Sequence, residues 1–355
     1  MSQTIRFANA QQFTFHQSLK QRVKEYFDQK GLSSNGGMRM IGKGLFWILA
    51  YLGPLTLLIT VPMPWWAAML VFVWLGIALA GIGMGVMHDA CHNSFSDKAW
   101  INRLFASSIY MIGGNKFSWK MQHNVYHHTY TNIHGADEDI AGMALLRFDK
   151  HQPLRPVHRF QHLYAPLLYS MMTLSFYVKD VRQAIQWSMA KGPQFVFQQM
   201  TKLITGKLLY FGILLVLPLM LSPLSWITVL AGFLVVNLVA GFIMAIVFQL
   251  AHVVEGADQP LPDDKGLMDN SWAVHQLQTT ANFSPGNRWL TWYLGGLNYQ
   301  VEHHLFPNIS HIHYPAIARI VRETAAEFGY GYNTFPSMAL AVNSHLRTLK
   351  AYGRS

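Results

Sequence analysis

Two long tracts without any charged residue constrain this chain more than any other feature of its sequence. No Lys, Arg, Asp or Glu occurs from Gly44 to His88, and none occurs from Leu208 to Val254. A helix crosses a bilayer in about 20 apolar residues, so each tract is long enough for two crossings. Only 12% of the chain is charged, about half the share of an ordinary soluble domain. These tracts predict a polytopic membrane protein and argue against a very apolar soluble core.

Prolines divide each tract near its middle, where a helix would end. The first tract contains VPMP, with Pro62 and Pro64, and the second contains LPLMLSP, with Pro218 and Pro223. We therefore expect an all-α integral membrane protein, with two transmembrane hairpins and a cytoplasmic helical cap, that forms one domain over residues 1–355. The expected spans are 44–60, 65–87, 207–221 and 225–250, and the expected cytoplasmic regions are 1–43, 88–206 and 251–355.

The positive charges predict how the chain is oriented. The hairpin tips have none, so all 27 Lys and Arg lie in the N-terminal arm, in the segment 89–207 and in the C-terminal part. The positive-inside rule places these regions in the cytoplasm, across a membrane of the bacterial inner-membrane type. The polar N-terminal arm does not resemble a signal peptide. The net charge of +10 suits anionic membrane lipids, and we expect no nucleic-acid partner because no such binding module is evident.

Two further apolar segments are not expected to span the membrane. Residues 160–178 are uncharged, but they contain Pro166 and several hydroxyl side chains, and a crossing there would separate polar regions that the charges place together. Residues 99–113 carry Arg103. We expect both segments at the interface or packed against the helical bundle. The single cysteine, Cys91, excludes an internal disulfide, and we expect it to be a small buried side chain.

Many of the 17 histidines gather near the predicted cytoplasmic ends of the spans. Residues four apart on a helix share a face, so HDACH and QHNVYHH each direct two imidazoles to one place. A third motif is QVEHH, and one further histidine follows the fourth span. Each motif alone has a structural explanation, such as capping, but together they indicate a metal centre. The eight candidate ligands are His88, His92, His123, His127, His128, His252, His303 and His304.

The type of ligand leaves the metal open, because imidazole binds zinc, copper, iron and nickel. Eight imidazoles exceed the three or four protein ligands of one zinc ion and fit two metals that each keep an open position. A zinc protease would need Glu where HDACH has Asp89. A metal transporter would place its ligands near the membrane midplane, whereas these lie outside it. Two open, nitrogen-ligated metals beside a membrane favour oxygen activation.

The three motifs resemble, in their order and in the two spans between them, the histidine boxes of membrane-bound fatty acid desaturases. The likeness runs from about residue 5 to residue 350 and includes GGNKFSWKMQHNVYHHTYTN, ADEDI, FQLAHVVE, HQLQTTANF and GLNYQVEHHLFPNISHIHYPAI. The chain is similar to the bacterial branch of this family that is related to linoleoyl-CoA and front-end desaturases. In that branch, Gln replaces the first His of the third box. Sister enzymes with similar boxes hydroxylate alkyl chains or decarboxylate free fatty acids to terminal alkenes, and these reactions remain alternatives.

The resemblance implies O₂-dependent oxidation of a long fatty acyl chain, most simply insertion of a cis double bond. It implies two non-heme ferrous ions as cofactors, bound by the seven box histidines, which are expected to be catalytic, and by His252. The expected electron donor is a separate ferredoxin or cytochrome b5, because the N-terminal arm lacks a haem-binding pattern. The acyl chain would be linked to CoA, acyl carrier protein or a lipid, or be a free acid, in an apolar tunnel bordered by aromatics such as Trp119.

Further residues are expected to support these ligands. Ligating imidazoles usually donate their second N–H to a carboxylate, carbonyl or amide. Gln300 lies three residues before His303, so we expect both to face the same centre, and His275 is a further candidate for a ligand or supporting residue. His311 and His313 are expected to be solvated or to face lipid headgroups. The expected supporting carboxylates are Asp89, Asp137, Asp139 and Glu302.

Overall fold

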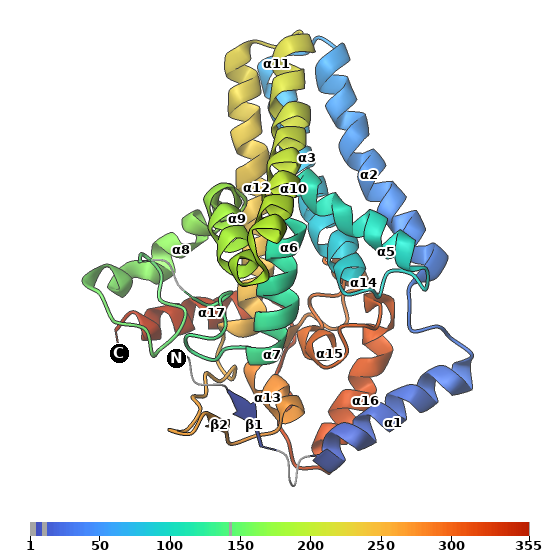
Figure 1. Cartoon of the computed structure of the whole chain (residues 1–355), viewed down its shortest axis with the longest axis vertical. Helices are drawn as coiled ribbons and strands as arrows, with labels where there is room; N and C mark the ends of the chain where they lie inside the picture. The colour runs from blue at the N-terminus through green and yellow to red at the C-terminus, as the bar shows by residue number, and fades with distance from the viewer. Residues whose placement is uncertain (1–4, 9–12, 142–143, 355) are drawn as a thin grey trace. The chain divides into compact units, whose positions relative to one another are not determined.

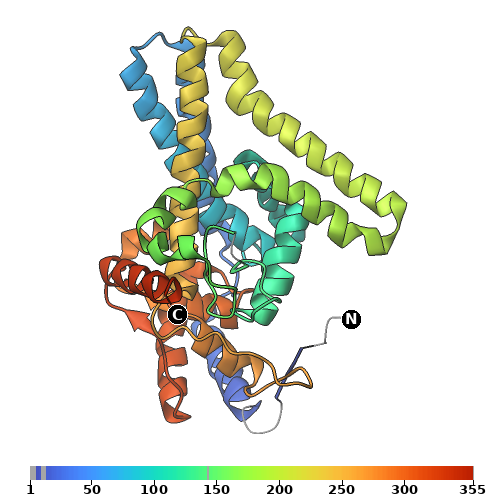
Figure 2. The same ribbon diagram turned by 90° about the vertical axis from the view of Figure 1, so that its left-hand side faces the viewer.

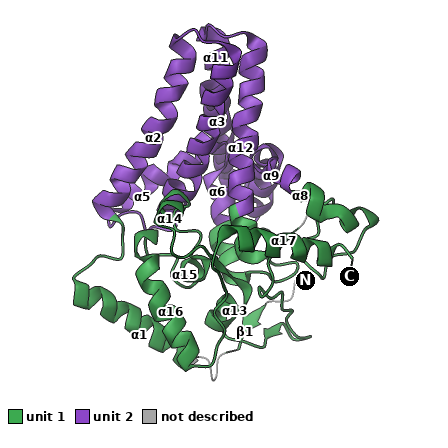
Figure 3. Cartoon of the chain, turned by 180° about the vertical axis from the view of Figure 1, so that it is seen from behind, with its two compact units in different colours: residues 1–36, 122–165, 247–355 green, residues 37–121, 166–246 purple. Residues whose placement is uncertain are grey.

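The computed structural model describes residues 5–8, 13–141 and 144–354, and these residues are largely helical (Figure 1, Figure 2). The chain divides into two compact units (Figure 3). We call residues 37–121 and 166–246 the hairpin unit, and residues 1–36, 122–165 and 247–355 the histidine unit. Three elements pass from one unit into the other: η3 (Lys120–His127), α8 (Gln161–Tyr169) and α12 (Trp226–His252).

The hairpin unit is built around helices that are long and apolar enough to cross a membrane. Four such helices occur among the described residues, Gly37–Thr60, Trp65–Cys91, Pro193–Leu221 and Trp226–His252, which confirms the predicted number of spans. The elements of this unit are α2 (Gly37–Thr60), α3 (Trp65–Ile82), η1 (Gly83–Met87), α4 (His88–Cys91), α5 (Ala99–Ala106), η2 (Ser107–Ile112), α6 (Lys116–Trp119), α9 (Met172–Ser188), η5 (Met189–Lys191), α10 (Pro193–Phe211), η6 (Gly212–Val216) and α11 (Leu217–Leu221).

The third long helix starts well before the expected position 207. Gly192 adopts a φ of 92°, and Pro193 then occupies the first helical turn, where its missing N–H costs no hydrogen bond. The 29 residues of this helix extend about 43 Å, more than the hydrocarbon core of about 30 Å. Because the first half of this helix is polar, hydropathy alone did not predict that the helix begins there. The fourth helix also ends later than expected, so His252 is its last residue instead of following it.

Small residues let the long helices of the hairpin unit approach closely. A Cβ atom added at Gly76 of α3 would lie 2.7 Å from Val239 of α12. A Cβ atom at Gly232 of α12 would lie 2.1 Å from the ring of Phe72. Both glycines are therefore required for the contact between α3 and α12. Cys91 is fully buried, as the sequence predicted.

The uncharged segment 160–178 does not form a fifth span. It contains α8 and the start of α9, which are separated by a break at Ser170 and Met171, and neither helix is long and apolar enough to span a membrane. Thr173 Oγ1 donates to the carbonyl of Asn237 at 2.8 Å, and the Tyr177 hydroxyl donates to Asn237 Oδ1 at 2.9 Å. These bonds attach α9 to α12, in agreement with the expected packing against the bundle.

The histidine unit has its own apolar core, in which α1, α13, α15 and α16 meet. Phe15 and Leu19 of α1 are buried there with Val274, Val301 and Val321. Two short parallel strand pairs, β1 with β2 and β3 with β4, join distant segments of the unit. Its elements are β1 (Arg6–Phe7), α1 (Phe13–Lys30), α7 (His128–Tyr130), η4 (Pro156–Phe160), β2 (Leu267–Met268), α13 (Trp272–Thr279), β3 (Asn282–Phe283), α14 (Arg288–Tyr293), α15 (Gln300–Leu305), η7 (His311–His313), α16 (Tyr314–Glu327), β4 (Thr334–Phe335) and α17 (Met338–Tyr352).

Candidate metal centre

The second histidine motif lies on a widened helical turn. The sequence predicts α-helical spacing, with His123 and His127 on one face, but Lys120–His127 form the π-helix η3. Hydrogen bonds in a π-helix join residues five apart, and such turns occur frequently at functional sites. The Nε2 atoms of His123 and His128 accordingly lie 3.3 Å apart. Because the ring centroids of His123 and His127 are 5.2 Å apart, this one turn gathers all three imidazoles.

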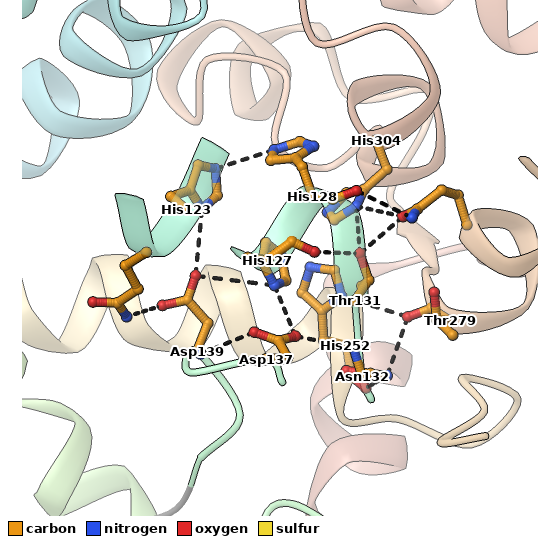
Figure 4. Close-up of polar contacts among 12 residues, drawn as sticks. His123, His127, His128, Thr131, Asn132, Asp137, Asp139, His252, Thr279 and His304 are labelled. Atoms are coloured by element: carbon orange, nitrogen blue, oxygen red, sulfur yellow. Dashed lines mark hydrogen bonds and ion pairs between the residues drawn. The ribbon is translucent and has the colours of Figure 1, made fainter. Parts of the chain in front are cut away.

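His127, His252 and His304 form a buried triad, which comes from η3, the end of α12 and α15. One ring nitrogen of each lies within 4.8 Å of a ring nitrogen of the other two. The three side chains have no exposed surface. Figure 4 shows that these rings, which are far apart in the sequence, lie beside one another within the histidine unit. The triad therefore has the donor set and the spacing that a metal ion requires.

In two rings of the triad, a hydrogen bond to a neighbouring side chain fixes Nδ1, which we call the outer nitrogen. His127 Nδ1 lies 2.9 Å from Asp137 Oδ2 (Figure 4). His304 Nδ1 lies 2.8 Å from Gln276 Oε1. Because these oxygens accept, both rings carry their proton on Nδ1 and keep the Nε2 lone pair for a metal. His127 Nε2 is buried, and no group among the described residues hydrogen-bonds to it. The residues present therefore fit a bound metal ion.

His123, His128 and His303 form a second group in the histidine unit. The rings of His128 and His303 are 4.6 Å apart, and ring nitrogens of His123 and His303 lie within 4.8 Å of each other. Outer nitrogens again face oxygen atoms: His123 Nδ1 lies 3.4 Å from Asp139 Oδ2, and His303 Nδ1 lies 3.1 Å from the Tyr314 hydroxyl. Like the triad, the second group thus has two rings whose Nδ1 atoms face oxygen atoms.

The acidic run that follows the second motif supplies the carboxylates of both groups. Asp137 Oδ2 accepts from His127 and from the backbone N–H of Asn132, both at 2.9 Å. Burial by itself lowers the pKa of His127, but the charge of Asp137, with a smaller effect of Asp139, raises it above the ordinary value. The structure thus brings Asp137 and Asp139 to the ring nitrogens that the sequence analysis expected them to support. Glu138, between them, is only partly buried.

In the hairpin unit, His88 and His92 share a face, as their spacing predicted. His88 is the first residue of the short helix α4, which follows the π-helix η1, and His92 directly follows α4. Their ring centroids are 4.8 Å apart, and the Trp119 ring lies edge-on to both, at 5.7 Å and 5.9 Å. Asp89 Oδ1 is 3.9 Å from His88 Nδ1. The first motif is therefore a buried imidazole pair covered by an indole.

Two candidate supporting residues have other partners. His275 Nε2 donates to the carbonyl of Thr131 at 2.8 Å, and burial lowers the pKa of His275 to about 4, which keeps the ring neutral. The Glu302 carboxylate accepts from Asn282 Nδ2 at 2.8 Å and from the Tyr332 hydroxyl at 2.9 Å, and burial raises its pKa to about 7. These contacts hold α13 and α15 in place and do not orient an imidazole of the triad.

Gln300 faces the triad through a contact that its spacing to His303 did not predict. Gln300 Nε2 lies 3.1 Å from His252 Nε2. His252 is 48 residues away in the sequence, so only the folded chain brings the two side chains together. The Gln300 amide thus lies beside the ring atom with which His252 would bind a metal.

The expectation that His311 and His313 are solvated was wrong. Only 2% of His311 and 8% of His313 are exposed. The Ser310 N–H donates to the carbonyl of Ser34 at 2.9 Å, and the His313 ring packs edge-on against Phe27. Helix α1 and the residues that follow it cover this segment, which an interpretation based on local polarity cannot show.

Gln276 and Thr131 were missed by the sequence analysis. Gln276 Oε1 accepts from His304 and lies 2.9 Å from the Thr131 hydroxyl. The single proton of that hydroxyl is directed to the carbonyl of His127 at 2.6 Å or to Gln276. The motif HQLQTTANF drew attention to His275, but its neighbour Gln276 reaches the triad. The available signal was an amide directly after the candidate residue His275.

Comparison with known proteins identifies the family of this chain. The sequence model of the family described as "Fatty acid desaturase" matches residues 64–336. The chain is 36% identical over 345 residues to the sn-1 linoleoyl-lipid 6-desaturase of Synechocystis sp., covering 96% of both chains. It is 33% identical to the sn-1 linoleoyl-lipid 6-desaturase of Arthrospira platensis, over 93% of this chain and 90% of the relative. It is 34% identical to the acyl-lipid (8-3)-desaturase of Physcomitrium patens, over 99% and 74% of the two chains. The chain therefore belongs to the membrane fatty acid desaturase family of oxidoreductases.

Proposed function

We propose that this protein is an acyl-lipid desaturase, which inserts a cis double bond into a long fatty acyl chain carried by a membrane lipid, with O₂ as co-substrate. The observation that carries the proposal is the buried triad of His127, His252 and His304, with outer nitrogens held by Asp137 and Gln276. The names of the three relatives support desaturation over decarboxylation or hydroxylation. They also support a lipid carrier over CoA, acyl carrier protein or a free acid.

We propose two non-heme irons as the cofactor, because the imidazoles form two groups. One iron would be bound by the triad, and the other would have ligands from the second group. The pair in the hairpin unit is proposed as further ligands on the strength of the family's motif. The chemistry that two ferrous ions supply is reduction of O₂ coupled to oxidation of an unactivated methylene. The proposed ligands are His88, His92, His123, His127, His128, His252, His303 and His304.

The residues around the triad would prepare it for this chemistry. Asp137 and Gln276 hold the protons of His127 and His304 on Nδ1, which leaves each Nε2 able to bind metal. The negative charge of Asp137 makes the His127 ring a stronger donor. Burial of the rings excludes bulk water, which limits side reactions. Trp119, which covers His88 and His92, would border the acyl chain there.

The carrier and the reaction can be tested together by lipid analysis. Cells that express the wild type or His127→Ala would be supplied with linoleate, and their lipids would be analysed by mass spectrometry, with volatile alkenes collected from the headspace. We expect an additional double bond in lipid-linked acyl chains, only with the wild type. A terminal alkene or a hydroxylated chain as the main product would contradict the proposal.

We propose that the site lies on the cytoplasmic side of a bacterial-type inner membrane, as the distribution of the 27 Lys and Arg indicates. Reporters inserted near Gln152 and fused after Ser355 should both read cytoplasmic, and a reporter near Pro223 should read external. An external signal at Gln152 would show that the orientation is wrong.

We further propose that electrons come from a separate ferredoxin or cytochrome b5. Purified protein with O₂ and lipid should turn over only when one of these donors and its reductase are added. Equal turnover without either donor would contradict this part of the proposal.

A further inference from the structure

The backbone of Asn132 adopts a conformation that few side chains tolerate. Its φ is 58°, in the left-handed region that favours glycine and, among residues with a side chain, asparagine and aspartate. The residue is fully buried in the histidine unit. Its backbone N–H donates to Asp137 Oδ2 at 2.9 Å, and the same oxygen accepts from His127. The turn at Asn132 therefore fixes the carboxylate that orients one ring of the triad.

The side chain of Asn132 meets the ends of two helices. Its Nδ2 donates to the carbonyl of His252, the last residue of α12, at 2.9 Å. It also lies 3.2 Å from the carbonyl of Thr279, the last residue of α13. The last carbonyls of a helix have no partner within the helix, so they need donors from elsewhere. The Asp258 carbonyl is 3.2 Å from the same nitrogen, so two amide protons serve three carbonyls.

One of these carbonyls faces the outer nitrogen of the remaining triad ring. His252 Nδ1 lies 3.4 Å from the carbonyl oxygen of Thr279 (Figure 4). Because a carbonyl only accepts, this ring carries its proton on Nδ1, as the other two triad rings do. The Asn132 amide and the His252 ring thus share one acceptor, and the amide also holds the His252 backbone. Asn132 therefore acts on His252 at its carbonyl and at its ring.

Asparagine combines the two properties that position 132 requires. Glycine accepts a positive φ without strain but has no amide to donate. Aspartate tolerates the same φ, but its carboxylate has no proton to donate and would be repelled by the three carbonyl oxygens. Alanine would strain the backbone and would also lack the donor. The type of residue at this position thus follows from both the turn and the three carbonyls.

We propose that Asn132 is a positioning residue of the triad. Through Asp137 and Thr279 it fixes the outer nitrogens of His127 and His252, so that their Nε2 atoms are held ready for one metal ion. The inference rests on the proposed function, because it requires that the triad binds a metal. Asn132 itself contacts neither the metal nor the acyl chain in this role.

Cobalt(II) binding tests this role without turnover. The full-length protein would be loaded with cobalt(II) and titrated with a chelator, while the visible absorption of the bound ions reports their coordination. Asn132→Asp should weaken binding of one ion by about 10- to 100-fold and change its absorption, the effect expected when the partners of ligating imidazoles are lost. Asn132→Gly keeps the positive φ and the N–H to Asp137 but lacks the amide, so it should weaken binding by about tenfold.

Asn298→Asp is the matched control, because it also replaces a fully buried amide in the histidine unit. Asn298 Nδ2 donates to Thr291 Oγ1 at 3.0 Å and lies 3.3 Å from the carbonyl of Ser284, and neither group is a partner of a triad imidazole. Thermal unfolding of each metal-free protein would measure what the loss of a buried amide costs in stability. The control should bind cobalt(II) with the affinity and absorption of the wild type.

Unchanged affinity and absorption in Asn132→Gly would overturn the proposal, even if Asn132→Asp does not fold. An equal loss of affinity in Asn298→Asp would also overturn it, since reduced stability would then explain the effect. Loss of one ion in the Asn132 variants alone, in a protein that desaturates no lipid, would support the positioning role and refute the reaction. Lipid desaturation by the wild type together with unchanged binding in Asn132→Gly would refute the positioning role alone.

Discussion

Two regions of the histidine unit bury histidines and use them differently. In η3, His127 directs one ring nitrogen to Asp137 and the other toward His252 and His304. In α17, His345 donates from its Nδ1 to a backbone carbonyl. Burial lowers the pKa of His345 to about 4, whereas the pKa of His127, which burial also depresses, is raised overall by Asp137. A carboxylate partner together with neighbouring imidazoles distinguishes a candidate ligand, and burial alone does not.

The largest effect should come from removing a triad imidazole. We expect His127→Ala to lose iron and to lower desaturation more than about 100-fold, because a missing ligand costs more than a missing supporting residue. Iron content by mass spectrometry and product yield would be measured on the same preparation. His345→Asn should keep iron close to the wild-type level. Full iron in purified His127→Ala would end the assignment of the triad.

The next largest effect should come from the carboxylate that orients His127. Asp137→Asn replaces a charged acceptor with an amide, so we expect iron affinity to fall by about 10- to 100-fold. Chelator competition would measure this affinity. Glu138→Gln is the matched control, since it removes a charge from the same acidic run, and it should change little. Equal losses in the two variants would mean that net charge, and not the bond to His127, matters.

Gln300 tests whether an amide beside the triad tunes the site. Gln300→Ala should keep iron but lose most of its turnover, with a rate about tenfold lower, because the amide that contacts His252 is removed. Gln300→His adds a stronger donor, and we expect normal iron with slower turnover. Iron content and product yield should be determined together for both variants. Wild-type turnover in Gln300→Ala would leave only a structural role for this side chain.

A smaller effect concerns stability and pH. The unfolded chain takes up a proton on His345 near the ordinary pKa of 6.5, but the folded chain does so only near pH 4. Stability should therefore be full above pH 6.5 and fall by up to about 3 kcal/mol as the pH drops to 4. Thermal unfolding in detergent would be followed across this range. His345→Gln, which cannot be protonated, should show a smaller decline, and an equal decline would exclude His345 as its source.

The smallest effect is expected for His275, which resembles His345 and not His127. Its Nε2 donates to the carbonyl of Thr131, so an amide can replace the imidazole as a donor. We expect His275→Gln to keep iron and to retain turnover within about twofold. Iron loss comparable to that of Asp137→Asn would show that the comparison between the two kinds of histidine fails at this residue.

The sequence by itself determined the membrane helices and the residue types of the site. The two charge-free tracts specify four long helices because an uncharged tract of that length is stable across a bilayer, whatever its neighbours. The histidine motifs and the acidic run are local patterns, and the structure brings the side chains of HNVYHH, those of the third box and His252 close together within one unit. The family, too, could be recognised from these motifs.

Only the tertiary structure decided which atoms face which. The contact of Gln300 with His252, the bond from His304 to Gln276 and the packing of His313 against Phe27 all depend on partners from distant segments. Helical periodicity relates residues three to five apart, so it carries no information about such pairs.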